Sequence, residues 1–315
     1  MDKKILCLDG GGAKGFFPAS FLTSLEDLLE VKIVDYFDLI VGTSTGGIIA
    51  LGLGLGLDAK DILEFYKQHV PEIFKKSIKK SMIGLFSVKH KGDYLKNALE
   101  SVFGDKKLGH SRVRLVIPSV NLETGEVYIY KTCHNKRFLN DYKLSVVEVA
   151  MSTSAAASYL EIFKSKSGLS FIDGGIFCNN PIGLAAVEAI KIIGWTDKEV
   201  KILSIGCTEE PLGVEKGRNS KWCGGLYWLK KIPEVFMKTQ SFYAMGTAQL
   251  LIGKNNIFRI SPVVNRGRFK IDDYEEMESL IGLGASEARQ HSPEIKEVFF
   301  REKAEPFIPH RQLSI

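Results

Sequence analysis

The chain has 315 residues, of which 45% are hydrophobic and 25% are charged, and its formal net charge is +5. These values indicate a globular protein with a sizeable core, and they give no reason to expect binding to a nucleic-acid polymer. No stretch of about 18 apolar residues is present, which excludes a membrane-spanning helix. The N-terminal sequence contains no long apolar run, so no signal peptide is expected and the predicted location is the cytoplasm.

Strand-like and helix-like segments alternate along the first two thirds of the sequence. Short apolar runs predict strands, and apolar residues at helical spacing predict helices. This alternation predicts an α/β fold with a mostly parallel sheet that helices cover on both faces. In chain order, we predict a strand at 4–8, a helix at 15–30, a strand at 36–42, helices at 46–57 and 59–74, two strands within 112–132, a helix at 145–158, a strand within 169–175, a helix at 181–194 and a strand at 200–206.

From about residue 232 the pattern is helical, apart from a strand-like segment at 256–262. The sequence contains no repeat and no linker-like stretch rich in Pro or Ser. We therefore expect residues 1–231 to form the α/β unit and residues 232–315 to form a helical C-terminal extension that packs on the same domain.

A glycine-rich loop follows the first predicted strand, in the sequence CLDGGGAKGFF. Gly10, Gly12 and Gly15 have the G-x-G-x-x-G spacing of a dinucleotide-binding turn, and such a loop points backbone N–H groups at an anion. A dinucleotide site also needs an acidic residue at the end of the second strand, which ends here in Gly-Thr-Ser-Thr-Gly. We therefore expect the N–H groups of Gly10, Gly11 and Gly12 to form an oxyanion hole.

The end of the second predicted strand carries a G-x-S-x-G sequence, formed by residues 42–46. It lies between an apolar strand and a helix of small residues, which is the context of a nucleophile elbow. Gly42 and Gly46 remove side chains that would collide with the neighbouring backbone. Ser44 is the predicted nucleophile.

A serine nucleophile needs a base that takes its proton. The six histidines are scattered and none follows a strand, so we expect them in surface or structural roles. Asp173 ends an apolar strand in the sequence FIDGGIFCNNP, and Gly174 and Gly175 allow a sharp turn behind it. If that strand is parallel, Asp173 lies at the same sheet edge as Ser44. Asp173 is therefore the predicted base, with a pKa raised by its apolar flanks.

Together, the three motifs resemble the patatin-like phospholipases. The pattern of that family is D-G-G-G-x-[R/K]-G, then G-x-S-x-G, then D-G-[G/A], and all three occur here in order, at 9–15, 42–46 and 173–175. The resemblance covers roughly residues 4–206. It implies a three-layer α/β/α fold, a Ser44–Asp173 dyad without histidine, and hydrolysis of the acyl esters of membrane phospholipids, with no cofactor and no metal.

The opening L-D-G-G-G-x-K-G sequence also resembles phospholipase effectors of anti-phage signalling systems, which cyclic nucleotides switch on. This resemblance implies activation by a cyclic dinucleotide and action at the inner face of the membrane, and the C-terminal helices offer a surface for self-association. Two alternatives stay open. One is an unregulated lipid acyl hydrolase or thioesterase, and the other is a catalytically idle lipid- or nucleotide-binding protein, against which the intact motifs argue.

Two basic segments are candidate contacts with a membrane surface or with a phosphorylated effector. Residues 75–91 contain six lysines and no acidic residue, and residues 216–231 combine basic with aromatic side chains. A solvated face is the alternative interpretation of both. The candidate contact residues are Lys75, Lys76, Lys79, Lys80, Trp222 and Trp228.

Overall fold

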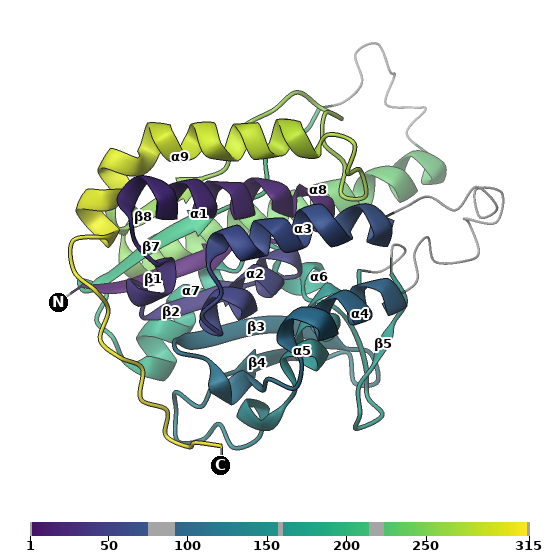
Figure 1. Ribbon diagram of the computed structural model, residues 1–315. Helices are drawn as coiled ribbons and strands as arrows, with labels where there is room; N and C mark the ends of the chain where they lie inside the picture. Colours follow the sequence, from purple (N-terminus) through teal and green to yellow (C-terminus); the bar gives the residue numbers. More distant parts are fainter. Residues whose placement is uncertain (1, 75–91, 157–159, 214–223, 314–315) are drawn as a thin grey trace.

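A mixed β-sheet runs through the centre of the computed structural model, which describes residues 2–74, 92–156, 160–213 and 224–313 (Figure 1). The strand order is β5-β6-β3-β2-β1-β7-β8, and β4 pairs with β3 beside this path. The strands of the described residues are β1 (Lys3–Leu8), β2 (Leu39–Gly42), β3 (Arg114–Asn121), β4 (Val127–Lys131), β5 (Phe163–Lys164), β6 (Ser170–Asp173), β7 (Val200–Ile205) and β8 (Ile257–Ile260).

Helices cover both faces of the sheet. Successive side chains of a strand point to opposite faces, so each central strand contributes apolar side chains to two cores. Leu6 and Leu8 of β1 belong to a core cluster that includes side chains of α1, α2, α3 and α9, whereas Ile5 and Cys7 belong to a second cluster with α7 and α8. The α-helices are α1 (Phe16–Leu29), α2 (Thr45–Gly54), α3 (Ala59–Phe74), α4 (Gly92–Phe103), α5 (Val146–Ser154), α6 (Gly175–Cys178), α7 (Ile182–Val187), α8 (Gly225–Ile252) and α9 (Met277–Phe299).

The five central strands β3, β2, β1, β7 and β8 are parallel to one another. β4, β5 and β6 pair in antiparallel fashion. Both faces of the parallel strands are covered, which is why these strands are almost continuously apolar. The predicted three-layer α/β/α fold with a mostly parallel sheet is confirmed.

The C-terminal part of the chain joins both the sheet and the core. α8 connects β7 to the parallel strand β8, and α9 lies alongside α1 on the opposite face (Figure 1). The strand-like segment predicted at 256–262 corresponds to β8. The boundary that the sequence suggested between residues 231 and 232 falls inside α8.

Two local expectations differ from the structure. α4 was not predicted, although its buried Leu95, Leu99 and Phe103 have helical spacing. The helix expected at 181–194 is α-helical only over α7 and continues as a π-helix over Glu188–Ile193, which ends at Gly194 with φ +89°.

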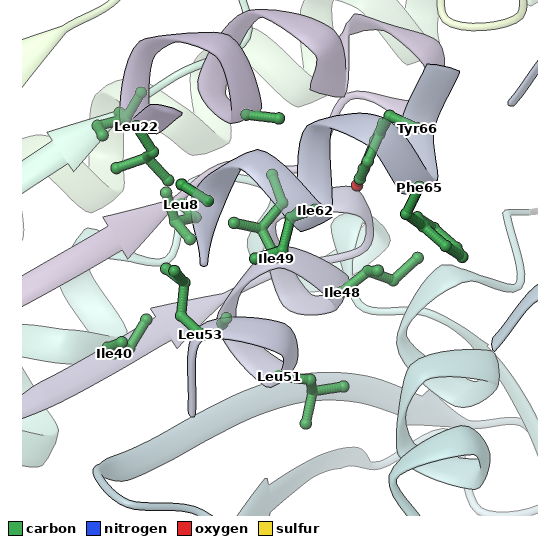
Figure 2. Packing of buried hydrophobic residues seen from close by; sticks show 14 of the residues in the cluster. Leu8, Leu22, Ile40, Ile48, Ile49, Leu51, Leu53, Ile62, Phe65 and Tyr66 are labelled. Carbon is green, nitrogen blue, oxygen red and sulfur yellow. The ribbon is translucent and has the colours of Figure 1, made fainter. Parts of the chain in front are cut away.

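The core beneath the second strand–helix junction is dense. Figure 2 shows Leu8 of β1, Ile49 of α2 and Ile62 of α3 in one cluster, in which all three side chains are almost fully buried. α2 itself is buried at each of its ten residues. A helix packed on all sides fixes the position of the residue that precedes it, which is Ser44.

Candidate active site

Ser44 occupies a strained turn between β2 and α2. Its φ of 55° and ψ of −121° are uncommon for a residue with a side chain, and such strain is typical of functional sites. The turn is tight because a Cβ on Gly42 would lie 2.2 Å from the Gly46 carbonyl oxygen, and a Cβ on Gly46 would lie 2.4 Å from the Leu8 carbonyl oxygen. The two glycines therefore allow the close approach on which the turn depends.

The hydroxyl of Ser44 meets the carboxyl group of Asp173. Ser44 Oγ donates a hydrogen bond to Asp173 Oδ2 at 2.6 Å, and the Gly175 N–H donates one to Asp173 Oδ1 at 2.7 Å. Both side chains are buried. The hydroxyl proton of Ser44 therefore points at Asp173 Oδ2, while the bond from the Gly175 N–H to Oδ1 holds the carboxyl group in place.

Asp173 reaches this position from an antiparallel strand, which corrects the sequence argument that placed it at the end of a parallel one. β6 runs against β3, with Asp173 opposite Ser119 near the end of β3. β6 begins at Ser170, just beyond the last residue of β3, and runs back along β3 only as far as Asp173. A Cβ on Gly174 would lie 2.2 Å from the Pro118 carbonyl oxygen, so only glycine fits directly after the aspartate.

Burial raises the pKa of Asp173 to about 6, against an ordinary value of 3.8. The hydrogen bonds from Ser44 and Gly175 act in the opposite direction, because they stabilise the ionised carboxylate. A carboxylate with this pKa is a stronger base than an exposed aspartate and is still mostly ionised at neutral pH.

The glycine-rich loop lies beside the dyad, but its three N–H groups are not equivalent. The Gly10 N–H already donates to the Asn179 carbonyl at 2.9 Å, which removes it from the three donors expected from the sequence. The N–H groups of Gly11 and Gly12 have no acceptor among the described residues. A Cβ on Gly11 would lie 2.5 Å from Cys207 Sγ, and Gly12 has a φ of +57°.

Two residues that the sequence argument did not single out support the site. Thr153 Oγ1 accepts a hydrogen bond from the Ser44 N–H at 3.0 Å and donates one to the Pro118 carbonyl at 2.6 Å. Asn179 Nδ2 donates to the Gly10 carbonyl at 3.2 Å. Thr153 therefore joins the elbow to β3, and Asn179 joins the glycine loop to the segment that follows Asp173.

A cavity of about 1100 Å³ opens onto Ser44 and Asp173. No histidine of the described residues lines it, and the buried His134 instead bonds Glu188 at 2.9 Å. The apolar side chains in its walls suit an acyl chain. They include Ile48, Phe65, Val70, Phe74, Leu95, Leu160, Met237, Phe242, Phe269 and Ile271.

The candidate contact residues are only partly described. Trp228 lies near the start of α8, is 46% exposed and stacks edge-on against Tyr227. Lys75, Lys76, Lys79, Lys80 and Trp222 lie outside the described residues. Within the described ranges, no group of three or more His, Cys, Asp or Glu side chains is arranged to hold a metal ion, and no helix has the length and hydropathy needed to cross a membrane.

A model of the patatin-like phospholipase family matches residues 6–186, which is more than half of the chain and includes Ser44, Asp173 and the glycine loop. The chain belongs to this family. Membership supports lipid hydrolase activity, and the patatin fold agrees with the three-layer architecture.

Individual relatives carry more specific names. The chain is 34% identical over 232 residues to a cGAMP-activated phospholipase of Pseudomonas aeruginosa, covering 71% of this chain and 69% of the relative. It is 34% identical over 238 residues to a cGAMP-activated phospholipase of Escherichia coli, covering 70% and 67%. Among solved structures, VipD of Legionella pneumophila aligns with a TM-score of 0.48 at 15% identity, over 93% of this chain and 67% of that one.

Proposed function

We propose that the protein cleaves fatty acyl esters of membrane phospholipids, with Ser44 as nucleophile and Asp173 as its base. The observation that carries this proposal is the 2.6 Å hydrogen bond from Ser44 Oγ to Asp173 Oδ2 in a cavity with apolar walls. Family membership supports the lipid substrate class.

In the first half of the reaction, Asp173 Oδ2 takes the Ser44 proton while Ser44 Oγ bonds to the ester carbonyl carbon. The tetrahedral intermediate collapses, the bond to the alcohol oxygen breaks, and Asp173 returns the proton to the leaving alcohol. In the second half, Asp173 takes a proton from water, whose oxygen attacks the acyl-enzyme. Collapse releases the fatty acid, and Asp173 returns the proton to Ser44.

The negative charge of both intermediates develops on the former carbonyl oxygen. We assign the N–H groups of Gly11 and Gly12 as its donors, because both lack an acceptor among the described residues, whereas that of Gly10 is engaged by Asn179. Donors fixed before the reaction stabilise the transition state without reorganisation.

Gly11→Ala is expected to lower kcat by about 100-fold, the usual effect of losing one such donor. The new Cβ would lie 2.5 Å from Cys207 Sγ and 2.7 Å from Cys207 Cβ, so the loop must move. The double variant Gly11→Ala/Cys207→Gly removes both of these atoms and is expected to recover much of the activity. Wild-type kcat in the single variant would contradict the assignment of Gly11.

The decisive experiment for the hydrolase is to treat the protein with a fluorophosphonate and map the modified residue by peptide mass spectrometry. Modification at Ser44 is expected, because this probe reacts with activated serines and needs no knowledge of the lipid. No labelling, or labelling elsewhere, would favour an idle lipid-binding protein over an enzyme.

We further propose that a cyclic dinucleotide of the cGAMP class activates the enzyme at the inner face of the membrane. The names of the 34% identical relatives support this step. The test measures fatty acid and lysophospholipid released from mixed phospholipid vesicles by mass spectrometry, with cGAMP, with another cyclic dinucleotide and without nucleotide.

Release that rises at least tenfold with cGAMP is the expected result. Equal release in all three reactions would contradict activation and favour an unregulated acyl hydrolase. Release from acyl thioesters but not from vesicles would favour a thioesterase. Fluorophosphonate labelling with and without nucleotide separates a change at Ser44 from a change in vesicle binding.

A further inference from the structure

An ion pair joins the glycine loop to the C-terminal part of the chain. Asp9, the residue before Gly10, accepts two hydrogen bonds from Arg259 of β8, from Nη1 to Oδ1 at 2.8 Å and from Nη2 to Oδ2 at 2.6 Å. This bidentate geometry fixes the orientation of the Asp9 carboxylate as well as its distance from Arg259. Arg259 lies 250 residues from Asp9 in the sequence and outside the segment that matches the family.

The surroundings hold this pair in place. Arg259 Nη1 also donates to Ser204 Oγ at 2.8 Å, and Nη2 lies 3.6 Å from Glu209 Oε1. Both members are largely buried, with side chains 17% and 7% exposed. Burial opposes the charge of Arg259, but the Asp9 carboxylate outweighs this effect and raises the pKa of the guanidinium, so the arginine stays charged.

A second contact from the same region reaches the other end of the loop. The Ala13 N–H donates to the Ile271 carbonyl at 2.7 Å, and a Cβ on Gly12 would lie 2.5 Å from that oxygen. The two N–H groups assigned to the oxyanion hole, those of Gly11 and Gly12, therefore lie between Asp9 and Ala13, and C-terminal residues bind both of these.

From this geometry we infer that Arg259 is a positioning residue for the oxyanion hole: by binding Asp9 from β8, it holds the Gly11 and Gly12 N–H groups in the orientation that the transition state requires. The inference rests on the proposed hydrolase and its oxyanion hole. Arg259 and Asp9 both line the cavity that opens onto Ser44, and the inferred role of Arg259 is exerted through Asp9 and the loop, not through a bond to the substrate. β8 thereby has a positioning role in catalysis.

The test compares kcat and KM of Arg259→Gln and Arg259→Lys, with kcat expressed per site titrated by the fluorophosphonate. We expect Arg259→Gln to lower kcat by about 100-fold with little change in KM, because a misplaced oxyanion hole affects the transition state more than the bound ester. Arg259→Lys keeps the charge but cannot form the bidentate pair, so its kcat is expected to lie between those of Arg259→Gln and the wild type.

Lys131→Gln is the matched control. Lys131 binds Glu188 at 2.6 Å, with side chains 12% and 1% exposed, so the substitution breaks a comparably buried ion pair. Lys131 does not line the cavity. The substitution should lower thermal stability and leave kcat per titrated site within about twofold of wild type. If Arg259→Gln does not fold, Asp9→Asn/Arg259→Gln removes both charges and is expected to show the same loss of kcat.

Wild-type kcat per titrated site in Arg259→Lys and in the double variant would overturn the inference. So would an equal loss in Lys131→Gln, because a general loss of rigidity would then explain the effect. Failure of the hydrolase proposal gives a different result, since wild-type protein would then show neither labelling at Ser44 nor release of fatty acid.

Discussion

Ser44→Ala is expected to abolish ester hydrolysis, with kcat lower by about 10⁴-fold or more, because no other group forms the acyl-enzyme. The variant should remain folded, since alanine occupies the same space without the Oγ that bonds Asp173. Fluorophosphonate labelling should disappear together with the activity. Turnover near that of wild type would rule out Ser44 as nucleophile.

A second substitution at the same position tests the strain in the elbow. Alanine keeps the cost of a φ of 55° and a ψ of −121°, whereas glycine adopts such angles without that cost. Ser44→Gly is therefore expected to be more stable than Ser44→Ala by about 1 kcal/mol, measured by denaturant unfolding, although both are inactive. Equal stability would show that the strain is no larger than the extra conformational entropy that glycine loses on folding.

The motifs singled out Ser44 and Asp173, which the structure joins by a hydrogen bond, because glycines close beside each residue mark its turn. The elbow needs Gly42 and Gly46 within four residues of each other, and the aspartate turn needs Gly174 directly after the carboxylate. A Cβ at any of these three positions would lie within about 2.4 Å of a backbone oxygen. Only Gly42 approaches an oxygen of its own motif, whereas Gly46 and Gly174 approach the carbonyls of Leu8 and Pro118. In each case the glycine required stands within two residues of Ser44 or Asp173, so the sequence expresses the constraint as a short pattern.

What the sequence did not reveal depends on contacts between distant segments. The Gly10 N–H is occupied by Asn179, and Asp9 is bound by Arg259, and neither partner is near the loop in the chain. The antiparallel direction of β6 is likewise set by its pairing with β3. α4 is a different case, because its buried residues Leu95, Leu99 and Phe103 have helical spacing in the sequence itself.

Asp173→Asn separates the catalytic from the energetic consequences of burying the base. An amide cannot take the Ser44 proton, so kcat should fall by about 10³- to 10⁴-fold. In the wild-type enzyme, kcat/KM should rise with pH along an acid limb near pH 6, because the free enzyme must hold Asp173 ionised, with its pKa raised by burial to about 6. An acid limb near pH 4 would contradict a buried base.

The same burial makes the ionised carboxylate costly to the fold, in a direction that can be measured. Below pH 3.8, Asp173 is protonated in both the folded and the unfolded protein and has no effect on the pH dependence of stability. As the pH rises from there through about 6, the unfolded chain loses this proton first. Stability therefore falls, by about 3 kcal/mol at about 1.4 kcal/mol for each pKa unit. Asp173→Asn lacks this loss, so relative to wild type the variant should gain thermal stability between pH 4 and pH 7.5 while remaining inactive. A difference between the two proteins that does not change with pH would show that Asp173 has an ordinary pKa, and its strength as a base would then need another source.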